Sequence, residues 1–184
     1  RQTIADSDPA LAHAIFEGMV AFAPDDPRAA YGLARADVQR ALRRLAEGDA
    51  GAVAAASSAR DALVTAVALE VPVPNSAEYL RIAWFNLATG YENAGEIDTA
   101  LELGRAAGET LPDEPLGPVM VARTLGWRAA TGAGGGACEP ATADLREALD
   151  ALATIPRGEL PAYLVSSHAE SHRSLAFAAA SCQD

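Results

Sequence analysis

The sequence contains few aromatic residues and no lysine. Only 5% of its 184 residues are aromatic, whereas 44 are Ala. Because β-sheets favour branched and aromatic side chains and Ala is the strongest helix former, this imbalance predicts an all-α protein. All 14 basic residues are Arg. The absence of Lys excludes a lysine Schiff base and a lysine-bearing phosphate loop.

Positive charge is scarce as well. The 25 acidic residues outnumber the 14 basic ones and give a net charge of −11 at pH 7. A nucleic-acid-binding protein needs a basic face for the phosphate backbone, so this balance argues against a nucleic-acid partner. No run of 18 apolar residues occurs, so the sequence predicts no membrane span. The chain begins with Arg1 rather than Met, which indicates a processed or trimmed product, and the lack of a signal peptide therefore decides nothing.

Apolar residues recur three and four positions apart along most of the chain, which predicts eight helices in one domain, residues 1–184. Asp8 is expected to cap the first helix and Ser76 the fourth. The glycine-rich segment TGAGGGACEP, residues 131–140, is expected to be a flexible loop. The predicted helices cover residues 9–23, 28–47, 52–70, 76–93, 97–110, 118–130, 141–154 and 161–180.

Residues 81–114 carry a spaced pattern of large and small side chains. The pattern W-x2-L-G-x2-Y, with Ala for Gly, is followed by a turn glycine, two small residues and a proline, at Trp84, Leu87, Ala88, Tyr91, Gly95, Ala100, Ala107 and Pro112. This segment resembles a tetratricopeptide repeat. Gly104 departs from the family, which has a larger apolar residue there. Residues 117–156 and 8–24 resemble degenerate parts of further repeats. The alternative is a generic helical bundle that mimics one repeat.

The resemblance implies antiparallel helical hairpins stacked as a right-handed α-solenoid. Such families bind peptides or protein segments on a concave surface lined by the first helix of each hairpin, so it also implies a non-catalytic scaffold with a protein or peptide partner and no cofactor. The implied groove residues are Phe85, Asn86, Thr89, Arg123, Trp127, His168 and His172. The alternative is that Phe85 and Trp127 complete the core between hairpins.

His168 and His172 form the best candidate metal pair. Two His residues four positions apart on a helix share one face and can share a metal ion. Glu170 points elsewhere, no third ligand is evident, and the motif is not HExxH, so we predict no metal site. The pair supports the alternative functions of a metal-handling protein or an all-α enzyme. A structural subunit of a larger assembly is the third alternative.

Cys138 and Cys182 are the only cysteines, and neither lies in a CxxC motif. In an array of up-and-down helices, the end of the sixth helix and the end of the eighth lie at the same side, so we expect a disulfide between them. A disulfide favours a periplasmic or secreted location. The alternative is two inert thiols and a cytoplasmic protein. The segment GAGGGA, residues 132–137, matches a dinucleotide fingerprint but lacks the preceding strand, so we interpret it as a loop.

Overall fold

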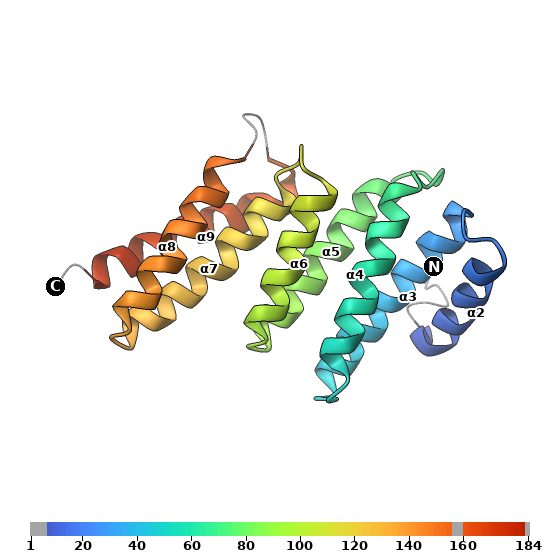
Figure 1. Cartoon of the computed structure of the whole chain (residues 1–184), viewed down its shortest axis with the longest axis horizontal. Helices are drawn as coiled ribbons and strands as arrows, with labels where there is room; N and C mark the ends of the chain where they lie inside the picture. Colours follow the sequence, from blue (N-terminus) through green and yellow to red (C-terminus); the bar gives the residue numbers. More distant parts are fainter. Residues whose placement is uncertain (1–6, 156–159, 183–184) are drawn as a thin grey trace. The chain divides into compact units, whose positions relative to one another are not determined.

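The computed structural model describes residues 7–155 and 160–182. These residues form eight α-helices and no strand (Figure 1), which confirms the predicted all-α class. The helices are α2 (Pro9–Phe22), α3 (Pro27–Ala46), α4 (Ala52–Ala68), α5 (Ser76–Asn93), α6 (Ile97–Thr110), α7 (Leu116–Gly134), α8 (Cys138–Ala153) and α9 (Ala162–Ser181).

The chain divides into two compact units, residues 1–94 and 95–184. In the first unit α3 packs against α2, α4 and α5, and in the second α7 packs against α6, α8 and α9 (Figure 1). The helices have 14, 20, 17 and 18 residues in the first unit and 14, 19, 16 and 20 in the second. Both units therefore follow one four-helix plan. The single domain stays a prediction.

The sequence contains the trace of this duplication. The turn between the first two helices of each unit reads PDDP at residues 24–27 and PDEP at residues 112–115. Placing these turns in register aligns LARADVQRA, residues 33–41, with VARTLGWRA, residues 121–129. Near the start of the last helix of each unit, Tyr-Leu recurs at residues 79–80 and 163–164. The repeat of this chain is thus a four-helix unit, which our sequence analysis did not identify.

Two predicted local features are wrong. Ser76 does not cap α5: the N-cap is Asn75 in the left-handed region at φ 61°, and the Ser76 hydroxyl donates to the carbonyl of Val71 at 2.9 Å. The predicted loop 131–140 is mostly helical, because α7 continues to Gly134 and α8 already begins at Cys138. Only three residues connect them, and Gly136 takes the positive φ, 82°, that ends a helix.

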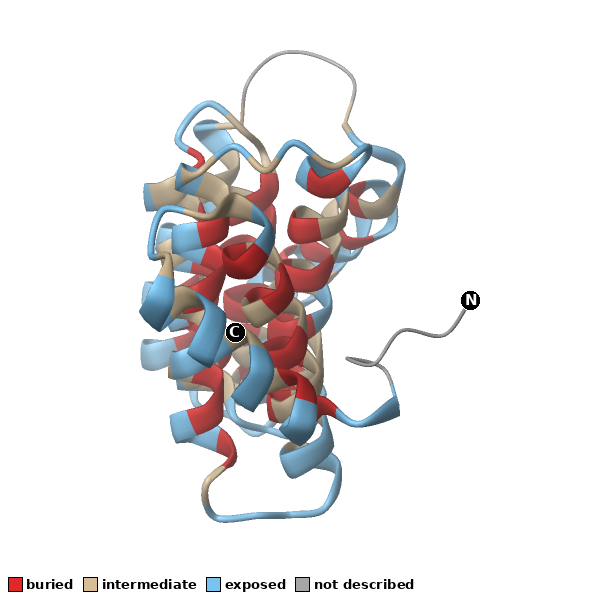
Figure 2. Cartoon of the chain, turned by 90° about the vertical axis from the view of Figure 1, so that its right-hand side faces the viewer, coloured by how far each residue is buried: buried red, intermediate tan, exposed pale blue. Residues whose placement is uncertain are grey.

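The core is built mainly from small side chains. More than half of the buried hydrophobic residues in the described part of the chain are Ala, and Figure 2 shows the buried residues as red bands along the helices. Trp84 and Tyr91 are the largest fully buried side chains, as predicted. The Tyr91 hydroxyl donates to the carbonyl of Ala52 at the start of α4, so Tyr91 joins α5 to α4. Its predicted contact with α6 would join the two units and stays a prediction.

Large and small residues exchange places between the two units. In the first unit, the Phe16 ring on α2 fills the space where Gly32 on α3 lacks a side chain. The equivalent position on α6 is Gly104, and there a Cβ would lie 3.3 Å from the Cβ of Met120, the residue that aligns with Gly32. The departure of Gly104 from the tetratricopeptide pattern therefore accompanies a large residue on the neighbouring helix.

The backbones of α6 and α7 approach each other closely in the second unit. A Cβ on Gly117 would overlap the backbone N and Cα of Gly108 and lie 3.0 Å from the carbonyl oxygen of Gly104. A backbone cannot move aside as the end of a flexible side chain can, so this contact requires glycine.

We predict that Gly117→Ala lowers the free energy of unfolding by about 1–3 kcal/mol, because the added methyl overpacks a backbone contact. Gly134→Ala is the matched control on the same helix, where no atom lies within 4 Å of an added Cβ; it should leave stability equal or slightly higher. Urea denaturation followed by circular dichroism measures both. Equal midpoints for the two variants would contradict the close approach.

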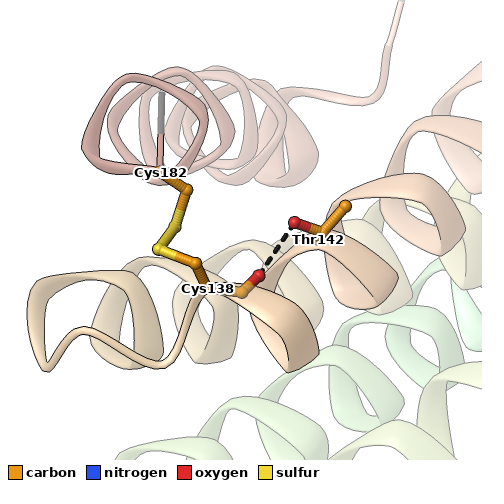
Figure 3. Close-up of a disulfide and its surroundings, with 3 residues drawn as sticks. All are labelled: Cys138, Thr142 and Cys182. Atoms are coloured by element: carbon orange, nitrogen blue, oxygen red, sulfur yellow. Dashed lines mark hydrogen bonds between the residues drawn. A yellow bond between two sulfur atoms is a disulfide. The ribbon is translucent and has the colours of Figure 1, made fainter. Parts of the chain in front are cut away.

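The structure joins Cys138 and Cys182 in a disulfide, with Cα atoms 5.5 Å apart, within the usual range. Cys138 begins α8 and Cys182 follows the end of α9, so the expected meeting of these two ends is confirmed (Figure 3). The Thr142 hydroxyl donates to the Cys138 carbonyl at 2.8 Å and supports the first turn of α8 (Figure 3). The disulfide does not show where the protein is located.

Denatured, unreduced protein should contain no titratable thiol. The disulfide closes a loop with a sequence separation of 44, so reduction should lower the free energy of unfolding by about 4 kcal/mol in the chain-entropy model. The variant Cys138→Ser/Cys182→Ser is the control, since its stability should not respond to reductant. Two titratable thiols per chain would refute the disulfide.

Candidate binding surface on the second unit

Arg128 connects three helices of the second unit through its side chain. Arg128 on α7 binds Asp144 on α8 through two hydrogen bonds, from Nε at 2.8 Å and Nη2 at 2.7 Å. Its Nη1 also reaches Asp98 on α6 at 3.3 Å. The hydrogen bonding that Arg128 donates to Asp144 is the main cause that raises the pKa of Arg128. This guanidinium joins three helices, and we assign it a structural role.

Arg123 lies on the side of α7 that faces α9. Its side chain is only 13% exposed, Nη1 lies 3.5 Å from the Ser167 hydroxyl, and Nε lies 3.8 Å from a carboxylate oxygen of Glu170. The aligned residue of the first unit, Arg35, stacks on the ring of Tyr79, with 4.7 Å between guanidinium carbon and ring centroid. Arg123 therefore orients α9 against α7.

Trp127 lies one turn beyond Arg123 on the same side of α7 and is 43% exposed. Trp127 is therefore not fully buried within its unit, and the alternative in which it completes the core between hairpins stays a prediction. On α9, Phe177 is 54% exposed and lies two turns beyond Glu170, on the same helical face. The two exposed aromatic residues thus belong to the adjoining edges of neighbouring helices.

His168 and His172 lie on a different side of α9. Their rings contact each other edge to face, with centroids 4.7 Å apart, as expected for residues four positions apart. Each is two positions from Glu170, and residues two apart on a helix do not face the same way. The α9 edge that meets Arg123 is therefore not the edge that carries the two His residues. Burial, and secondarily His172, lower the pKa of His168.

The other predicted groove residues belong to α5 in the first unit. Asn86 is exposed, whereas Phe85 and Thr89 are half-buried. A groove that combines α5 with α7 and α9 would include residues of both units, and it stays a prediction.

Metal and membrane features are absent from the described part of the chain. Within residues 7–155 and 160–182, no group of three or more His, Cys, Asp or Glu side chains could hold a metal ion. None of the helices described there is long and apolar enough to span a membrane.

Comparisons with protein-family models, with curated proteins and with solved structures find no match to this chain. The tetratricopeptide assignment accordingly stays a prediction from the residues themselves.

The candidate surface consists of Arg123 and Trp127 on α7 and Glu170 and Phe177 on α9. The sequence analysis did not identify Glu170 and Phe177 as members of it. A helical-wheel plot places them together, but it does not show which side of α9 packs on α7. The contact between Arg123 and Ser167 supplies that information, and it depends on the tertiary fold.

The lowered pKa of His168 predicts a pH-dependent stability. A pKa below the value near 6.5 of the unfolded chain means that folding favours neutral His168, so this contribution is present above pH 6.5 and is lost as the pH falls through the folded-state pKa. His172→Gln should raise the pKa of His168, because one positive neighbour is removed. Titration of the imidazole signals by NMR measures this shift.

Ser166→Gln is the control for the titration, since it changes an exposed residue of α9 whose helical position differs from that of the His pair. An unchanged pKa of His168 in His172→Gln would show that the two rings do not interact in solution.

Proposed function

We propose that this protein is a non-catalytic scaffold that binds a segment of another protein on the α7–α9 surface of its second unit. The observation that carries the proposal is the exposure of Trp127 beside an arginine that the structure already holds in place. Trp and Arg are the residues most often found as energetic anchors of protein interfaces, because Trp supplies a large rigid area and Arg supplies directed hydrogen bonds.

The duplication supports a functional role for Trp127. Its aligned residue in the first unit is Gln39, which is half-buried on α3, so the four-helix plan does not require an aromatic side chain there. An exposed Trp stabilises a fold little and exposes apolar area to water. Its presence in only one of two units with the same plan favours a contact with a partner.

The surface would suit an extended or helical segment with apolar side chains, because Trp127 and Phe177 offer exposed apolar area. We further propose that the helices of the whole chain form stacked antiparallel hairpins of the tetratricopeptide type. Support for this comes from the residues of the 81–114 segment and from the side-by-side packing of α7 and α9. His168 and His172 would then lie outside the centre of the binding surface.

We predict that Trp127→Ala weakens binding of a peptide selected from a displayed peptide library by at least about tenfold, as expected for a central anchor. The melting temperature should fall less than in Trp84→Ala, since Trp84 is fully buried whereas the Trp127 side chain is 43% exposed. Fluorescence anisotropy with the labelled peptide measures the affinity.

Leu149→Ala is the matched control, because Leu149 is an apolar side chain of α8 that is 54% exposed and that we place outside the surface. It should leave the affinity unchanged. Unaltered binding by Trp127→Ala, or an equal loss in both variants, would refute the assignment of this surface.

A further inference from the structure

The first unit contains a buried polar pair that its fold does not require. The Asp37 side chain on α3 is 4% exposed, and its Oδ1 lies 2.6 Å from Nδ1 of His13 on α2 and 3.2 Å from Nη2 of Arg40. The aligned positions in the second unit are Leu101 and Leu125, which belong to one buried hydrophobic cluster. The same plan therefore packs with two leucines where the first unit places a His and an Asp.

Burying these groups is unfavourable in itself. Burial raises the pKa of Asp37, and the neighbouring His13 and Arg40 side chains only partly oppose this effect. A carboxyl with a raised pKa destabilises the fold as the pH rises and the group ionises. Replacing buried charged pairs by apolar residues is often neutral or stabilising, so the pair calls for a reason other than stability.

The pair borders a cavity of about 280 Å³ over α3, between residues of α2 and α4. Asp37 lines it, and among the described residues both partners of Asp37 approach Oδ1, so Oδ2 retains the capacity to accept hydrogen bonds. The cavity is lined by His13, Glu17, Val20, Ala30, Leu33, Asp37, Ser58, Asp61, Ala62 and Thr65.

The hydroxyls of the cavity are acceptors too. Ser58 donates its proton to the carbonyl of Ala54 at 3.3 Å, and Thr65 donates to the carbonyl of Asp61 at 3.0 Å. Only their lone pairs remain available to a ligand. The polar lining thus consists mainly of acceptors, the carboxylates among them, and it faces an apolar wall. Such a lining fits a ligand with several N–H donors, a positive charge and a short apolar stem.

We propose that this cavity, called here the His13–Asp37 cavity, binds an alkylammonium group, with Asp37 as its deepest acceptor. A bare metal ion fits less well, because no group of three metal-ligating side chains occurs in the described residues. The chain has no Lys, so no side chain of its own or of a second copy supplies such a group. The ligand is a free small amine or the lysine side chain of another polypeptide.

The charge of the cavity agrees with this ligand. Three lining residues are carboxylates, and His13 is the one lining residue able to become positive. Arg40 approaches Asp37, and Arg60 pairs with Asp61 at 2.9 Å, so the three carboxylates outnumber these two guanidinium groups by one. His13 Nε2 also lies 3.6 Å from a carboxylate oxygen of Glu17, so the His13 ring borders two of the three carboxylates.

Calorimetric titration near neutral pH, at constant ionic strength, tests the proposal with n-butylammonium as the probe. It should bind saturably and at least about tenfold more tightly than n-butanol, which has the same stem without charge. Tetramethylammonium carries the charge without N–H donors and should also bind at least about tenfold more weakly. Equal affinity for n-butanol, or no saturable binding of n-butylammonium, would overturn the proposal.

Two variants locate the binding. Asp37→Asn should abolish saturable binding. His13→Leu/Asp37→Leu installs the residues of the second unit and should fold with unreduced stability and also lose binding, so the test does not depend on Asp37→Asn being folded. Glu78→Gln is the control, since Glu78 is exposed on α5 and does not line the cavity. Unchanged affinity in the folded double variant would refute the assignment.

A further titration separates the two sources of the ligand. Binding of Nα-acetyl-lysine methylamide as tight as that of n-butylammonium assigns the cavity to a lysine side chain of a polypeptide. Binding of n-butylammonium alone assigns it to a free amine. Binding of the Nε-acetylated compound as tight as that of its parent would contradict recognition of the ammonium group.

Discussion

The close approach of helix backbones through small residues is the constraint on which this structure depends. Each unit has a central helix, α3 or α7, in contact with three others. A helix can pack closely against three neighbours only where the side chains on its contacting faces are small. The buried residues are accordingly mostly Ala, and at Gly117 even one added methyl group would overlap the backbone of Gly108. Such a core gains little apolar area per side chain, so its stability rests on tight contact.

This constraint explains which parts of the fold could be predicted from the sequence. The helices could be predicted because Ala content and the spacing of apolar residues are local properties of the sequence. The ends of two helices could be predicted because Pro24 and Pro112, which break helices, follow them closely. The loop predicted at residues 131–140 was wrong because glycines that normally break helices are tolerated at the end of α7. The predicted cap at Ser76 was wrong because the Ser76 hydroxyl donates to the carbonyl of Val71 in the preceding segment. No local sequence pattern specifies this partner.

The candidate surface was predictable only in part. Helical spacing placed Arg123 and Trp127 on one face and His168 and His172 on one face, and both pairings depend on four-residue spacing alone. Which side of α9 meets α7 depends on the burial of residues such as Ser167 and Ser171, which a hydrophobicity pattern does not identify as core. For that reason the sequence analysis placed Trp127 and the His pair on one surface. In the structure, Arg123, one turn before Trp127 on α7, contacts Glu170.

Comparison of the two units separates residues that the shared four-helix fold requires from residues that it does not require. Arg35 aligns with Arg123 and Tyr79 with Tyr163, so these residue types occur in both units and are explained by packing within each. His13 and Asp37 align with leucines, and Trp127 aligns with Gln39, so here one unit shows that the plan folds with a different residue. A buried carboxylate or an exposed Trp is unfavourable unless another group covers or pairs with it. Because the same plan folds without them, the requirements of the fold alone do not explain these residues, and both proposals of binding start from them.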